Sequence, residues 1–152
     1  MQKEILLDFL AQNQTTCSFA FNQITPDNID FRLNEQTASV GFIYRHIGET
    51  MNMFGLFFGL PTAVQNTTMG RSDEGQGKNL DESHFLIKQA YDKLNDYVEA
   101  TADSAWLDPI DTPFFGTVSR ARLFSHILFH TAHHAGQIAL ALKRGKKEVS
   151  QV

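Results

Sequence analysis

The sequence predicts an all-α protein, a bundle of four helices. In four segments, apolar residues recur with the 3.6-residue period of a helix, and turn or capping residues separate these segments. The predicted helices span residues 2–23, 37–59, 80–101 and 117–144. A chain of 152 residues is long enough to bury a sizeable core, so we expect one domain over residues 1–152.

The first predicted helix and the turn after it follow from spacing and composition. In residues 2–23, apolar side chains return every three or four positions, and Cys17 lies among them as a small core residue. Residues 25–28, with the sequence TPDN, have the composition of a turn. Because Cys17 is the sole cysteine, an internal disulfide is excluded, which suits a reducing cytoplasm.

The second predicted helix, residues 37–59, carries a histidine within its apolar stripe. His46 falls at the centre of that stripe. An unpaired polar group buried there costs about 1–3 kcal/mol, so the ring needs a partner. The partner is either a hydrogen-bonding group, such as a backbone carbonyl or Thr50, or a metal ion. Glu49, almost one turn further on, is either a group that supports the histidine or a surface charge.

A long link, residues 60–79, separates the second and third helices and is rich in Gly, Ser, Asn, Asp and Thr. In a compact bundle, such a link either crosses from one end to the other or serves a site. A crossing would let the third helix, residues 80–101, run parallel to the second. The third helix opens with NLDE at residues 79–82, which resembles a capping box. His84 in its first turn is interpreted as a packing or capping residue.

The segment before the fourth helix, residues 102–116, contains two prolines and cannot continue a helix. We expect a loop with a short hairpin, folded over one end of the bundle. Its aromatic residues, which need a buried place, are Trp106, Phe114 and Phe115.

The fourth predicted helix, residues 117–144, holds four of the six histidines. These four are His126, His130, His133 and His134. Thr117 or Ser119 can cap the start of the helix. Cations in the last turn and Gly145 in a left-handed conformation would end it. We expect residues 146–152 to form a loose tail.

The four histidines differ in where they face. His130 and His134 lie one turn apart on the edge nearest the apolar stripe, whereas His126 and His133 lean towards the polar side. Two imidazoles one turn apart can bind one metal ion, and His46 is a candidate third ligand from the second helix. The pair His126 and His130 has the same spacing and is the second-ranked candidate for the two metal ligands on this helix. The simpler alternative is that each histidine packs with one hydrogen bond.

Composition excludes several kinds of partner. The net charge of −4 and the pI near 5.8 argue against a surface for nucleic acid or anionic membranes. No apolar run approaches the roughly 18 residues of a membrane span. The first residues, MQKEILLDFLAQ, carry acidic side chains and lack the pattern of a signal peptide. We therefore expect a cytoplasmic protein that binds neither nucleic acid nor membrane.

The stretches around the histidines resemble a known family. His46 lies within Phe42–Thr50, and residues 130–138 read HTAHHAGQI. A histidine in the second helix, followed roughly 80 residues later by HxxxHxGQI in the fourth, is similar to the DinB/YfiT-like superfamily. The resemblance covers nearly the whole chain. Two positions depart from it: Thr131 stands where relatives often have an acidic residue, and Ala135 stands where they often have arginine.

The resemblance implies an up-down-down-up order of the four helices, with a long crossover between the second and third, and frequently a dimer. It implies one divalent metal ion, commonly nickel or zinc, held by His46, His130 and His134. Characterised relatives are thiol S-transferases that use bacillithiol or related thiols, a mycothiol-dependent isomerase and proposed hydrolases. The implied partners are a small-molecule substrate, such as a low-molecular-weight thiol, and a second copy in a homodimer.

The chemistry of such a site follows from its ligands. Three neutral imidazoles leave a divalent ion with an open position for water or a substrate atom. The ion lowers the pKa of a bound water or thiol to near neutrality. Gln137, close to His130 on the helix, can hydrogen-bond a ligand or a substrate. Three classes stay open: a metal-dependent transferase or hydrolase, a non-catalytic metal-binding bundle, and a dimeric interaction protein.

Two further expectations concern the surface. The three aromatic residues of the 102–116 loop would form an apolar mouth close to the metal. Phe129 and Leu140 fall away from the apolar stripe of the fourth helix and among polar residues, as residues of a dimer interface do.

Overall fold

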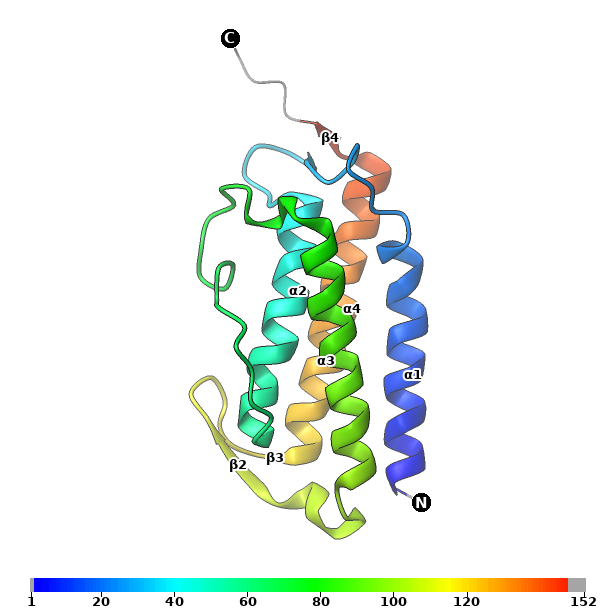
Figure 1. Cartoon of the computed structure of the whole chain (residues 1–152), viewed down its shortest axis with the longest axis vertical. Coiled ribbons are helices and arrows are strands. Elements are labelled where there is room, and N and C mark those ends of the chain that lie inside the picture. The colour runs from blue at the N-terminus through cyan, green and yellow to red at the C-terminus, as the bar shows by residue number, and fades with distance from the viewer. Residues whose placement is uncertain (1, 148–152) are drawn as a thin grey trace.

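The computed structural model describes residues 2–147, which are mostly helical, as the sequence predicts. Four long helices make up most of the chain (Figure 1). They are α1 (Gln2–Phe21), α2 (Val40–Gly55), α3 (Leu80–Ala100) and α4 (Arg120–Arg144). None of the described helices combines the length and the apolar character that a membrane crossing requires.

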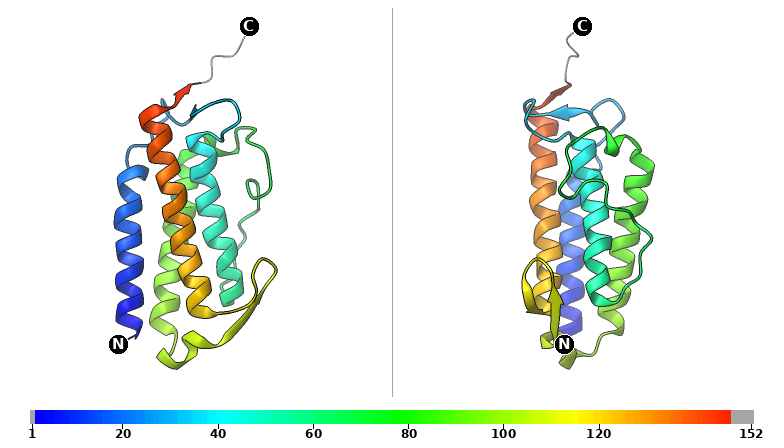
Figure 2. Two further views of the ribbon diagram at one scale, coloured as in Figure 1. Left: turned by 180° about the vertical axis from the view of Figure 1, so that it is seen from behind. Right: turned by 90° about the vertical axis from the view of Figure 1, so that its left-hand side faces the viewer.

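The four helices lie side by side with their axes roughly aligned (Figure 1 and Figure 2). α1 and α4 run in one direction, and α2 and α3 run in the other. α2 packs against α3 and α4, and α1 packs against the same two helices. The apolar stripes therefore meet in one shared core, which includes Ile47, Leu94 and Ile127.

Capping side chains fix where three of the helices begin. The caps are Ser39 before α2, Asn79 before α3 and Ser119 before α4. In each, a side-chain oxygen accepts a hydrogen bond from the backbone N–H three residues further on. α2 and α4 consequently each begin three residues later than predicted. α2 continues at its other end into a 3₁₀ turn, η1 (Leu56–Phe58).

The end of α4 differs from the prediction. Gly145 has an extended backbone (φ −74°, ψ 167°) and is not left-handed. A Cβ atom there would lie 2.4 Å from the carbonyl oxygen of Ala141, so close packing is what requires glycine. The chain then forms β4 (Lys146–Lys147), which pairs antiparallel with β1 (Phe31–Arg32). The first part of the expected loose tail is thus a strand, and the rest lies outside the described residues.

The segment between α3 and α4 folds as a short helix and a hairpin. The 3₁₀ helix η3 (Asp103–Leu107) precedes β2 (Pro109–Thr112), which pairs antiparallel with β3 (Gly116–Ser119). The hairpin lies at the end of the bundle where α4 begins (Figure 2). The expected hairpin is present, and its second strand takes up residues that the sequence assigned to the fourth helix.

The link between α2 and α3 runs back along α2, so that both helices begin at the same end of the molecule (Figure 2). It ends in a 3₁₀ turn, η2 (Gln76–Lys78), which presses against the start of α2. A Cβ atom at Gly77 would lie 2.0 Å from the carbonyl carbon of Gly41. Only glycine allows two backbones to approach so closely. This contact holds the link against α2.

Candidate metal centre

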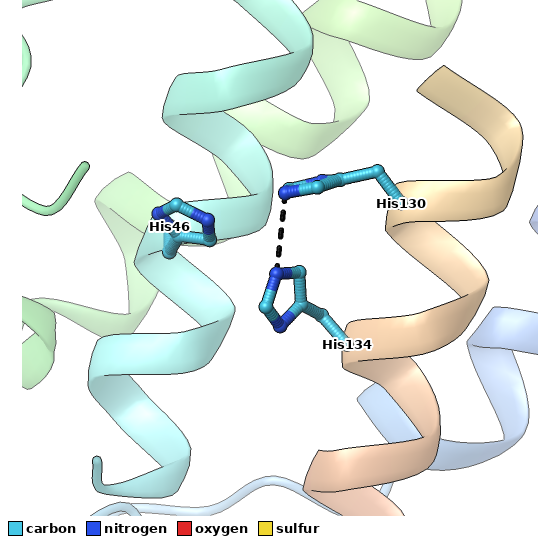
Figure 3. Close-up of side chains that lie close together, drawn as sticks. All are labelled: His46, His130 and His134. Carbon is cyan, nitrogen blue, oxygen red and sulfur yellow. Dashed lines mark hydrogen bonds between the residues drawn. The ribbon is translucent and has the colours of Figure 1, made fainter. Parts of the chain in front are cut away.

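Three histidine rings from two helices converge between α2 and α4. His46 projects from α2, and His130 and His134 project from successive turns of α4 (Figure 3). The ring of His46 has its centre 5.2 Å from that of His130 and 4.8 Å from that of His134. Each ring offers one nitrogen to a cluster whose atoms all lie within 4.8 Å of one another. The three residues that the sequence singled out as metal ligands are therefore brought together.

The spacing of the donors fits a metal ion. Two nitrogens bound to one tetrahedral ion at 2.0–2.1 Å lie about 3.3 Å apart. The Nε2 atoms of His130 and His134 are 3.2 Å apart (Figure 3). The largest span of the cluster is wider than this, and a movement of about 1.5 Å in one ring would remove the difference. This cluster could hold a metal ion.

The partner of His46 is Thr68, not Thr50. The Nδ1 atom of His46 lies 3.2 Å from the hydroxyl oxygen of Thr68. That hydroxyl donates its single hydrogen to the carboxylate of Glu49, at 2.7 Å, so it can only accept from the imidazole. His46 therefore carries its proton on Nδ1 and leaves Nε2 free as a ligand. The hydroxyl of Thr50 donates to the backbone carbonyl of His46 and does not reach the ring.

Glu49 anchors this arrangement from inside the protein. Its side chain is 0% exposed and accepts hydrogen bonds from Arg45 and from the backbone and hydroxyl groups of Thr67 and Thr68. Burial raises the pKa of Glu49, but the hydrogen bonds from Thr67, Arg45 and Thr68 outweigh it and hold the pKa below its ordinary value. Glu49 is thus a buried carboxylate that supports His46 through Thr68, which resolves the choice that the sequence left open.

The histidines of α4 have a more exposed partner. The Nδ1 atom of His134 donates to the amide oxygen of Gln137, at 2.7 Å, which leaves Nε2 of His134 unprotonated, as an acceptor facing Nε2 of His130. The amide nitrogen of Gln137 lies 3.2 Å from Nε2 of His133. Gln137 and His133 are exposed, so water competes for these contacts. Gln137 thus hydrogen-bonds one of the three candidate ligands, His134.

The rings of the cluster are neutral at ordinary pH. Burial lowers the pKa of His46 to about 4 and that of His130 to about 3, and the neighbouring His134 contributes to both shifts. Burial also lowers the pKa of His134. A divalent ion binds the neutral form of imidazole, so these shifts keep the ligands ready at pH 7.

The other histidines lie outside the cluster. The ring of His126 packs against Phe115, with centres 4.5 Å apart, and against Phe54. His133 is exposed. His84 in the first turn of α3 is also exposed, and its ring hydrogen-bonds the hydroxyl group of Tyr44, so it is a packing residue. The second-ranked pair, His126 with His130, therefore does not form the described cluster.

The aromatic loop behaves only partly as predicted. Phe114 and Phe115 pack against Phe54, whose ring centre lies 6.2 Å from that of His130. This part of the loop lies close to the cluster, as expected. Trp106 is buried between Tyr97 and Phe124 and serves the core. Trp106 thus takes no part in the expected apolar mouth, and Phe114 and Phe115 remain exposed.

The two positions that depart from the family pattern lie in the interior. The hydroxyl of Thr131 donates to the backbone carbonyl of Ile127, and Ala135 belongs to the core. Thr67 and Thr68, which do support the site, were not indicated by the sequence. The one available signal was Glu49, because a carboxylate beside an apolar stripe needs donors.

Fold and site together define a helical protein with a histidine cluster that could hold a metal ion. A family model of the DinB superfamily matches residues 10–138. The chain belongs to the DinB superfamily, as its resemblance at the histidines indicated. No curated protein matches the sequence.

Proposed function

We propose that the chain is a single-domain DinB bundle, in up-down-down-up order, that binds one divalent metal ion through His46, His130 and His134. The observation that carries the proposal is the convergence of three neutral ring nitrogens from two helices, within 4.8 Å of one another. Nickel or zinc suits three imidazole ligands, since both bind nitrogen strongly.

The proposed reaction is a metal-dependent transfer of a thiol group or a hydrolysis. A divalent ion with three histidine ligands has an open position, where it lowers the pKa of a bound thiol or water. The protein supplies the rest: Thr68 orients His46, Gln137 orients His134, and Phe54 covers one side of His130. Membership of the DinB superfamily supports a low-molecular-weight thiol as one substrate. The alternative is a non-catalytic metal-binding or interaction bundle.

Metal analysis of the purified protein tests the proposed ligands. The wild type should hold close to one equivalent of nickel or zinc. His46→Ala should lose tight metal binding, since the two remaining imidazoles fill only part of the ion's coordination shell and water would fill the rest. His133→Ala should keep it. The assignment is wrong if metal survives His46→Ala but is lost with His126→Ala or His133→Ala.

We also propose that the protein forms a homodimer through the outer face of α4. Phe129 is 75% exposed and Leu140 is 50% exposed, and both lie on this face away from the core. Burying such side chains against a second copy would remove apolar area from water. Light scattering at high protein concentration should give the mass of two chains, and a monomer there would rule the proposal out.

A further inference from the structure

A cavity of about 360 Å³ opens beside the histidine cluster, between the first turns of α2 and the last turns of α4. His46 and His134 form its floor. Its walls are mainly apolar and include Leu33, Ala38, Phe42, Ile43 and Ala141. A molecule in this cavity would therefore touch the rings that we assign to the metal and would rest against hydrocarbon.

The described lining residues of the cavity include no aspartate, glutamate, lysine or arginine. The polar groups among them, apart from the two rings, are Thr37, Thr68 and Gln137, which are neutral. The nearby carboxylate of Glu49 lies behind Thr68, is fully buried and is paired with Arg45. Away from the metal position, a charged substituent in the cavity would thus lose water without gaining an ion pair with the protein, which is costly.

We infer that this cavity binds a small substrate through an uncharged apolar group, such as a short alkyl or aryl chain, whose head group reaches the metal position. The volume lies at the lower end of the range for ligand sites, so the apolar group is short. This inference rests on the proposed metal site. It narrows the substrate to thiols, or to substrates of hydrolysis, that lack a charged tail.

A series of thiols tests the inference on metal-loaded protein. Binding of ethanethiol, propanethiol, butanethiol and pentanethiol would be measured by calorimetry. Affinity should rise roughly fourfold with each methylene until the cavity is full. 2-Mercaptoethanesulfonate is about as large as pentanethiol but ends in a sulfonate, which is a poor metal ligand, so it should bind at least about tenfold more weakly. Equal affinities along the series, or tighter binding of 2-mercaptoethanesulfonate, would overturn the inference.

A charge placed at the rim should reverse the preference. Leu33→Lys puts a cation on an exposed wall residue of the cavity and should tighten the binding of 2-mercaptoethanesulfonate while weakening that of pentanethiol. Leu107→Lys makes the same change at an exposed residue of η3, outside the cavity, and should leave both affinities unchanged. If the two variants behave alike, the cavity is not where these thiols bind.

A measurement of metal content distinguishes a failure of this inference from a failure of the proposed function. If the wild type takes up no metal, the proposed function fails, and the cavity is then tested in metal-free protein through the NMR signals of the Ile43 methyl groups. Pentanethiol should shift these signals and 2-mercaptoethanesulfonate should not. Absence of a shift with pentanethiol would refute the cavity as an apolar site. If metal binds and the affinity is the same for all four alkanethiols, the proposed metal site stands and only the inference fails.

Discussion

The histidine cluster has two halves, His46 on α2 and the pair of His130 and His134 on α4. The groups that hydrogen-bond the rings of these two halves differ in how far they are exposed to water. On α2, His46 is held by Thr68, which is held in turn by Glu49, a carboxylate with no exposed surface. On α4, His134 is held by the amide of Gln137, which is exposed. One half is fixed by a buried network that involves the link between α2 and α3, and the other depends on a single helix edge in contact with water.

This difference indicates which donor sets the geometry of the site. The orientation of His46 depends on the fold, because its network ties α2 to the link through several hydrogen bonds. The ring of His134 can turn more freely, since water can replace its contact with Gln137. We therefore expect substitutions behind His46 to affect both stability and metal binding, and substitutions behind His134 to affect metal binding slightly.

Among the substitutions, the largest effect should come from Glu49→Gln, which removes the buried carboxylate behind His46. Loss of the carboxylate removes one of the charged partners of the buried Arg45 guanidinium. It also weakens the hydrogen bonds that Thr67 and Thr68 donate to the side chain of residue 49. Removing one member of a buried ion pair costs about 3–5 kcal/mol of unfolding free energy. Chemical denaturation measures this loss.

The matched control for that substitution is Glu82→Gln. Glu82 also pairs with Arg45, at 2.8 Å, but its side chain is half-exposed. A pair of this kind is worth about 1 kcal/mol or less. Similar losses in the two variants would show that burial does not distinguish these carboxylates.

Acid should weaken both halves of the metal-free protein. The native pKa values of His46, about 4, and His130, about 3, lie below the ordinary value of about 6.5, so unfolding takes up protons between these values. The free energy of unfolding should therefore fall as the pH is lowered from about 6.5 towards 4, by at most about 1.4 kcal/mol per pH unit for each ring. Denaturation at several pH values measures this slope, which His46→Ala should make shallower. An unchanged slope in that variant would contradict the role of His46.

A smaller effect is expected for Thr68→Val, which removes the hydroxyl between Glu49 and His46 and keeps the shape. Loss of a group that orients a metal ligand typically lowers metal affinity 10–100-fold. Competition with a chelator measures the affinity. Thr50→Val is the control, because it removes a buried hydroxyl that bonds only to backbone carbonyls. Metal affinity should stay unchanged in the control, and a loss as large as that of Thr68→Val would remove the special role of Thr68.

The smallest effect is expected for Gln137→Ala. Its amide contacts His134 from an exposed position, so water can take over the hydrogen bond. Metal affinity should fall less than about tenfold, below the range for a ligand's fixed partner. The same chelator competition measures it. A loss greater than that of Thr68→Val would reverse the comparison between the two halves.

The sequence was sufficient for the parts of the site that depend on helical periodicity. His130 and His134 are neighbours because a helix brings residues four apart onto one face, and the apolar stripe places His46 inside. Their meeting across the bundle required the family resemblance, since nothing local sets the height at which two helices touch. The ends of the helices themselves were predicted to within four residues, with capping side chains deciding where three of them start.

The parts that the sequence did not indicate depend on where irregular segments settle. Thr68 reaches His46 because the link folds back along α2, and its residues have only the composition of a loop. Trp106 was expected at the mouth, yet the turn of η3 directs it into the core. β4 pairs with β1 across more than a hundred residues, and two lysines give no local sign of a strand.

The contact between Gly41 and Gly77 limits how this sequence can drift during evolution. Neither glycine has a side chain that could bind metal, yet a methyl group at either position would meet neighbouring atoms at less than 3 Å. Relief of such a clash would push the link off α2 and draw Thr68 away from Glu49. Selection that maintains the metal centre would thus also act on two residues without functional groups, and a lineage could replace them only together with a new path for the link.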